Sequence, residues 1–128
     1  MSATITPTIM GGKTEIMVYE IAKRHTKVLL FVSNRNTSTR IAETLDYEGV
    51  DVVRVADGDL ETALAEFKQI PSGVLIVSKS LSTGWRTKAD ATVYAECSLR
   101  LKSPGFFQLQ ERNAADPQPY LINCEVDF

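Results

Sequence analysis

Two short runs of uninterrupted apolar residues set the strongest limit on how this chain folds. Residues 28–32 read VLLFV and residues 74–77 read VLIV, and polar residues bound both runs. Four or five continuous apolar residues are typical of a strand that is buried on both faces. Such strands belong to parallel sheets that helices cover on either side. The chain is therefore expected to be an α/β protein.

The segments around these strands predict a layered sheet with crossover helices. Apolar residues at helical spacing predict helices over residues 14–25, 36–47 and 59–70. Thr37 or Ser38 would cap the second of these helices, and Asp59 would cap the third. Further strands are expected at residues 50–56, 92–95 and 120–126. Alternating strands and helices predict a single three-layer αβα sandwich with a mostly parallel sheet. Its expected limits are residues 11–128, after an N-terminal extension of residues 1–10.

Composition excludes several classes of protein. The 128 residues are 44% hydrophobic and 23% charged, which is typical of a globular domain, and the net charge is −2. Neither a signal peptide nor a membrane span is recognisable, so a cytoplasmic protein with no membrane contact is expected. Cys97 and Cys124 lie 27 residues apart, which matches no metal or redox motif, so two reduced, buried thiols and no metal site are expected.

Local charge allows a phosphate-binding surface and loop composition favours one, although charge runs alone are more often solvated faces. Residues 13–40 and 79–112 carry six basic side chains each, whereas residues 43–66 carry eight acidic ones. Ligands of parallel sheets bind outside the carboxyl ends of the strands, where hydroxyl, amide and basic side chains suit phosphate. The residues predicted to bind nucleic acid are Ser33, Asn34, Arg35, Arg40, Lys79, Ser80, Thr83, Gly84, Trp85, Arg86 and Lys88. Trp85 has two interpretations, a platform for a base or a core residue.

A Gly-Gly-Lys-Thr segment offers an alternative site. Gly12, Lys13 and Thr14 match the end of a phosphate loop, but Pro7 stands where the pattern has its first glycine. The segment either binds a nucleotide, with Mg²⁺ and Arg112, or simply opens a helix. The first possibility would make the chain a small P-loop NTPase or kinase-like protein.

Several segments in order resemble the motifs of one protein family. The segments are KVLLFVSNRN, VLIVSKSLSTGW with Gly84, and FFQLQERNAAD followed by PYLINCEVDF. They are similar to motifs IV, V and VI of the C-terminal RecA-like domain, domain 2, of superfamily 2 helicases and translocases. The likeness covers residues 11–127. GGKTEIMVYEIAKRH resembles the helix that opens this domain, where a Gly-Lys pair also occurs in Swi/Snf-type members.

Departures from the family's motifs bear on activity. Arg86 stands where motif V has an aspartate, and Ala115 stands where motif VI has its second arginine, while Arg112 falls on the first. Alanine cannot stabilise a transferred phosphoryl group. The resemblance therefore implies a stand-alone helicase-like module with no catalytic residues and no cofactor, which binds DNA or RNA. A protein partner that supplies a first helicase domain, or a second copy of the chain, is the other expectation, with Trp85, Phe106 and Phe107 at the docking edge.

Overall fold

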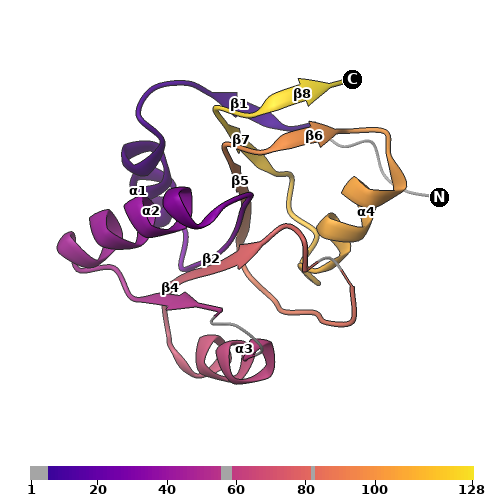
Figure 1. The fold of residues 1–128 in the computed structure, drawn as a ribbon. Helices are drawn as coiled ribbons and strands as arrows, with labels where there is room; N and C mark the ends of the chain where they lie inside the picture. Colours follow the sequence, from indigo (N-terminus) through magenta and orange to yellow (C-terminus); the bar gives the residue numbers. More distant parts are fainter. Residues whose placement is uncertain (1–5, 56–58, 82) are drawn as a thin grey trace.

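The fold is a parallel sheet with helices on both faces (Figure 1). The computed structural model describes residues 6–55, 59–81 and 83–128. Within these ranges a six-stranded sheet has the order β1-β7-β5-β2-β4-β3, and all its neighbours pair in parallel. Its strands are β1 (Thr8–Met10), β2 (Lys27–Val32), β3 (Val52–Arg54), β4 (Gly73–Ser78), β5 (Ala91–Ala95) and β7 (Tyr120–Ile122).

Helices separate most of these strands along the chain. They are α1 (Thr14–Arg24), α2 (Arg35–Tyr47), α3 (Leu60–Gln69) and α4 (Pro104–Glu111). A two-stranded ribbon of β6 (Ser98–Arg100) and β8 (Glu125–Asp127) continues beyond the carboxyl end of the sheet. No helix in the described ranges is long and apolar enough to cross a membrane.

Alternate residues of the central strand β2 pack into two separate hydrophobic cores. Val28 and Leu30 pack with side chains of α1 and α2, whereas Leu29 and Phe31 pack with those of α3 and α4. Figure 1 shows α1 and α2 together on one side of the sheet and α4 on the other. The predicted three-layer sandwich with a parallel sheet is confirmed.

The helix caps differ from those expected. Asn34 caps α2, and its Oδ1 accepts a hydrogen bond of 2.9 Å from the backbone N–H of Thr37. The prediction of Thr37 or Ser38 as the cap was wrong, because the helix begins at Arg35 and both residues are buried in its first turns. Asp59 stands at the N-cap of α3 as expected, but its side chain makes no capping bond.

The expected strand over residues 120–126 divides in two. Asn123 has φ of +50°, in the left-handed region, and ends β7, and β8 begins only at Glu125. Glu96 at the end of β5 has φ of +54°. A left-handed conformation in a residue with a β-carbon costs about 1–2 kcal/mol, so the surrounding contacts must hold these two bends.

Three short elements were not expected from the sequence. They are the strands β1 and β6 and the helix α4. Residues 1–5 of the expected extension lie outside the described ranges, whereas Thr8–Met10 form an edge strand of the sheet beside β7. Ala56, expected as the end of a strand, also lies outside the described residues, and β3 ends at Arg54.

Candidate nucleic-acid interface

The carboxyl edge of the sheet gathers many of the predicted site residues. Because all six strands run parallel, the loops that follow them open at one edge. Two groups of polar side chains lie there, one beside the start of α1 and one at the start of α2. The predicted residues on this edge are Ser33, Asn34, Arg35, Lys79 and Ser80, which follow β2 and β4, and Arg40 on α2.

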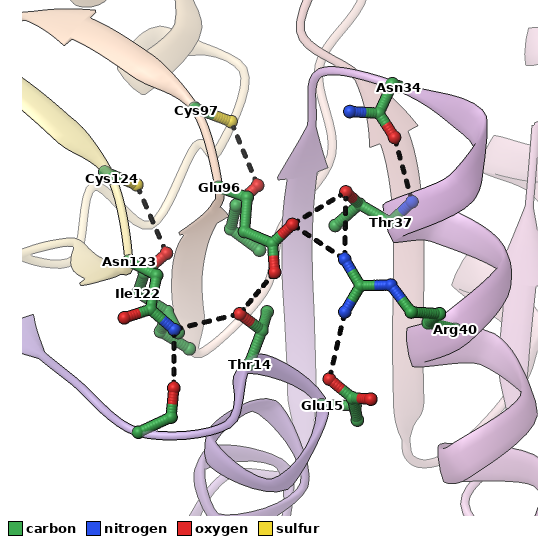
Figure 2. Close-up of polar contacts among 12 residues, drawn as sticks. Thr14, Glu15, Asn34, Thr37, Arg40, Glu96, Cys97, Ile122, Asn123 and Cys124 are labelled. Carbon is green, nitrogen blue, oxygen red and sulfur yellow. Dashed lines mark hydrogen bonds and ion pairs between the residues drawn. The ribbon is translucent and has the colours of Figure 1, made fainter.

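The first group is built around Glu96, and we call it the Glu96 cluster (Figure 2). The Glu96 carboxylate accepts hydrogen bonds from the hydroxyl of Thr14 at 2.5 Å and from that of Thr37 at 3.1 Å. Arg40 donates to it at 2.7 Å and to Glu15 at 3.1 Å. The Nδ2 of Asn123 donates to the Thr14 hydroxyl at 3.0 Å. The cluster therefore ties β5 and β7 to the first turn of α1 and to α2.

Electrostatics favour a charged carboxylate at this point. The hydrogen bond from Thr14 holds the pKa of Glu96 below its ordinary value, and Arg40 and Thr37 lower it further. The N-terminus of α1 adds the positive end of a helix dipole. The Arg40 guanidinium has two acidic partners, and the pKa of Arg40 is raised by them. Its charge is thus compensated within the protein.

The start of α1 is an ordinary helix start. Lys13 is the N-cap with extended backbone, and α1 begins at Thr14, as one of the two interpretations of this segment predicted. Thr8–Met10, which a phosphate loop would use to wrap its ligand, form the strand β1 instead. The carbonyl oxygen of Gly12 accepts a hydrogen bond of 2.6 Å from Asn123 Nδ2. The negative charge of Glu96 would repel a second anion at this place.

The second group surrounds a pocket of about 690 Å³, which we call the α2 pocket. Arg54, the last residue of β3, donates through Nε to Ser38 Oγ and through Nη2 to Thr39 Oγ1, both at 3.1 Å. Six of its ten lining residues carry a hydroxyl or a guanidinium group and three are apolar, and the first turn of α2 forms one side. The lining residues are Val32, Ser33, Asn34, Arg35, Ser38, Thr39, Arg54, Val55, Ile76 and Ser78.

Three predicted basic residues lie at the other edge of the sheet. Arg86 and Lys88 line a separate pocket with Lys27, the first residue of β2, and with Asp90, which precedes β5. The carbonyl of Arg112 accepts a hydrogen bond from the backbone N–H of Thr87. The expectation that Arg86 and Lys88 share the carboxyl edge with Arg35 and Lys79 is therefore wrong. The predicted grouping of Arg112 with Gly12, Lys13 and Thr14 in one nucleotide site is wrong as well.

The reason lies in the path of the loop after β4. Its residues leave the carboxyl edge at Lys79 and return to the amino edge by Asp90, whose N–H bonds to Lys27. Thr83 and Gly84 are exposed along this path. The side chains of one loop are thereby divided between two edges.

Trp85 belongs to the core. It is 6% exposed, its indole N–H donates to the Leu81 carbonyl at 2.7 Å, and its ring lies 6.1 Å from that of Phe31. The interpretation as a core residue is confirmed, and the ring presents no open face for a base. Phe106 is 2% exposed and Phe107 is half-buried. The expected apolar docking edge of these three aromatic side chains is therefore not exposed.

Sequence reasoning missed several side chains of this edge. Glu96 directly follows the expected strand 92–95, so the rule applied to the other loops could have found it. Asn123 falls inside the strand predicted over residues 120–126, so the sequence gives no sign that it ends β7. Arg54 falls inside the strand predicted over residues 50–56, whereas β3 ends at Arg54.

The comparisons with known proteins bear on the fold. No family model and no curated protein matches the sequence. The crystal structure of the Pyrococcus furiosus Hef helicase domain superposes with a TM-score of 0.57 at 18% sequence identity. The chain has a RecA-like helicase fold. The match covers 88% of this chain and 24% of the Hef chain, so this chain spans about a quarter of that structure.

Proposed function

We propose that the chain is a helicase-like module that binds the phosphate backbone of a nucleic acid at the α2 pocket. In this proposal it corresponds to domain 2 of superfamily 2 enzymes and does not itself drive ATP hydrolysis. The observation that carries the proposal is the pocket's lining of arginine, hydroxyl groups and a helix N-terminus.

The chemistry of the α2 pocket supports phosphate as its ligand. The N–H groups of a first helical turn and a nearby guanidinium both bind phosphate oxygens. The two hydroxyl contacts of Arg54 orient its guanidinium and use two of its five N–H groups. The helix dipole of the 13-residue α2 adds to the positive potential at the same place.

Contacts at the start of α1 support the proposal that the chain does not itself drive ATP hydrolysis. The Glu96 carboxylate contacts Thr14, where a phosphate loop would hold its anion, and β1 replaces the wrapped part of such a loop. Arg112 lies at the opposite edge of the sheet, beside Thr87. Together these features disfavour the P-loop NTPase.

Recognition is expected to be largely independent of base sequence. The groups of the α2 pocket are of the kind that contact phosphate and sugar, which position a nucleic acid without reading its bases. Trp85, which would have offered a stacking platform, is buried. Binding should therefore weaken steeply with salt, because phosphate contacts release counterions.

Anisotropy titrations with short single-stranded and duplex DNA and RNA test the proposal. Arg54→Gln should weaken binding about tenfold, since one charge-assisted contact of about 1.5 kcal/mol is lost. It should also lower the slope of log affinity against log salt by about 0.7–0.9. Lys88→Ala is the matched control, because it removes one charge from the opposite edge and should leave both quantities unchanged.

Two results would contradict the proposal. The first is no binding of any of the four nucleic acids at about 50 mM salt, where phosphate contacts are strongest. The second is a loss of affinity in Lys88→Ala with no change in Arg54→Gln, which would move the interface to the amino edge. Thermal melts with Mg-ATP add a check on the nucleotide alternative, because a bound nucleotide raises the melting temperature.

A further inference from the structure

The two cysteines of the chain lie opposite each other in the short segments that join β5 to β6 and β7 to β8. Tyr120 pairs with Val93 in the β5–β7 ladder and Glu125 pairs with Ser98 in the β6–β8 ladder, 27 positions apart in each case. Between these ladders, Glu96 N–H bonds to the Ile122 carbonyl and Glu125 N–H to the Cys97 carbonyl. One register therefore runs through both ladders, and it sets Cys97 opposite Cys124.

This register brings the two thiols within reach of a disulfide. Paired strands lie about 4.8 Å apart, inside the 4.4–6.8 Å range of Cα separations in disulfides. Both sulfurs lie near the end of β5, where Cys97 Sγ contacts the Ala95 carbonyl at 3.4 Å and Cys124 Sγ the Tyr94 carbonyl at 3.2 Å. Cys97 Sγ also lies 3.6 Å from the Phe31 carbonyl on β2, and Cys124 Sγ lies 3.5 Å from the Ile122 carbonyl on β7, so a side-chain rotation has to bring the sulfurs together. Figure 2 shows the two residues on neighbouring segments of the chain. Both are free thiols here.

The two thiols differ in access and acidity. Cys97 is 1% exposed, whereas Cys124 is only partly buried. The hydrogen bond from Cys97 lowers the pKa of Cys124 to about 7, against the opposing effect of burial. The same contact and burial raise the pKa of Cys97. Cys124 thus combines thiolate character with access to solvent, which are the properties of a reactive cysteine.

We propose that Cys97 and Cys124 form a redox-active dithiol that a hydroperoxide converts to an intramolecular disulfide. The Cys124 thiolate attacks one peroxide oxygen and the O–O bond breaks, which leaves Cys124 as a sulfenic acid and releases hydroxide, or water once protonated. The Cys97 sulfur then attacks the Cys124 sulfur, and hydroxide leaves with the Cys97 proton as a second water. Two thiols lose two electrons and one hydrogen peroxide is reduced to two waters.

The disulfide would close at a mechanically important point of the fold. Cys97 and Cys124 each follow a left-handed residue, Glu96 and Asn123, at the bend between the sheet and the β6–β8 ribbon. A covalent bond there would fix the ribbon to the sheet. This inference rests on strand register and does not depend on the proposed nucleic-acid function.

Peptide mapping after peroxide treatment tests the proposal on the whole protein. Trypsin cleaves after Lys88, Arg100 and Arg112, so the cysteines fall in separate peptides, residues 89–100 and 113–128. We expect these peptides joined by a disulfide in monomeric protein, a mass lower by two hydrogen atoms, and full reversal by dithiothreitol. In the reduced protein, iodoacetamide should label Cys124 before Cys97.

Single variants separate the two roles. In Cys97→Ser the sulfenic acid of Cys124 has no resolving thiol, so dimedone should trap it there and should not label the wild type. In Cys124→Ser the buried Cys97 should stay reduced. Thiols that remain free under conditions that oxidise glutathione completely would overturn the proposal. Disulfides formed only between molecules would overturn it as well.

Discussion

Because the backbone at Glu96 is left-handed, Glu96→Ala should destabilise the protein more than Glu96→Gly. Glu96→Ala removes three hydrogen bonds, from Thr14, Thr37 and Arg40. Each threonine bond contributes about 1 kcal/mol net. The Arg40 pair contributes about 0.5 kcal/mol, because the Arg40 side chain is 43% exposed. The free energy of unfolding should therefore fall by about 2.5 kcal/mol.

Glu96→Gly loses the same three bonds but relieves the backbone. Glycine adopts φ of +54° without the steric cost that a β-carbon brings, which is about 1 kcal/mol or more. The loss of stability should then be only about 1.5 kcal/mol. In urea unfolding followed by circular dichroism, the Gly variant should have a midpoint about 0.5 M above that of the Ala variant.

The variants Glu66→Ala and Glu66→Gly control for the general effect of glycine on stability. Glu66 is exposed within α3, where the backbone is helical and glycine is less stable than alanine by about 1 kcal/mol. The order of the two variants should thus reverse between positions 96 and 66. If Glu96→Gly unfolds at the same urea concentration as Glu96→Ala, or at a lower one, the argument from backbone strain is refuted.

Two further outcomes are expected from the same edge of the sheet. Because the pKa of Glu96 is lowered in the folded state, its stabilisation is present above its ordinary value of 4.5 and is lost as pH falls through the folded-state pKa. Urea midpoints should consequently drop more for the wild type than for Glu96→Gln between about pH 5 and about pH 3; parallel curves would contradict this. Asn34→Ala removes the cap of α2 and should destabilise the protein by about 1 kcal/mol. The exposed neighbour variant Asn36→Ala should change stability by less than about 0.5 kcal/mol, and equal losses would disprove the capping role.

The central strands could be predicted because their signal is local. The apolar runs located β2 and β4 to within one residue at each end. A strand covered on both faces needs apolar residues at successive positions, and few other structures need them. The edge strand β1 has no such signal, because it is three residues long and depends on a partner 112 positions away in the pair Thr8–Tyr120.

The candidate site could be predicted only in part. The polar loop after β2 revealed Asn34 and Arg35, because parallel topology fixes the edge at which that loop opens. The path of the loop from Lys79 to Asp90 is set by tertiary contacts, so the sequence could not show that Arg86 faces the other edge. Glu96 also gives no sequence signal for a left-handed backbone, because Gly, Asn and Asp are the residues that favour that region of φ and ψ.

The strand order also has a consequence for the sequence of events in folding. The most local ladder of the main sheet, β3 with β4, already joins residues as far apart as Val52 and Val74. Such non-local pairing makes folding slow, because loop entropy is lost before contacts compensate for it. During synthesis, β1 emerges long before its partner β7, which is made only at Tyr120–Ile122. Thr8–Met10 can therefore form strand pairs in this sheet only after Tyr120–Ile122 have left the ribosome.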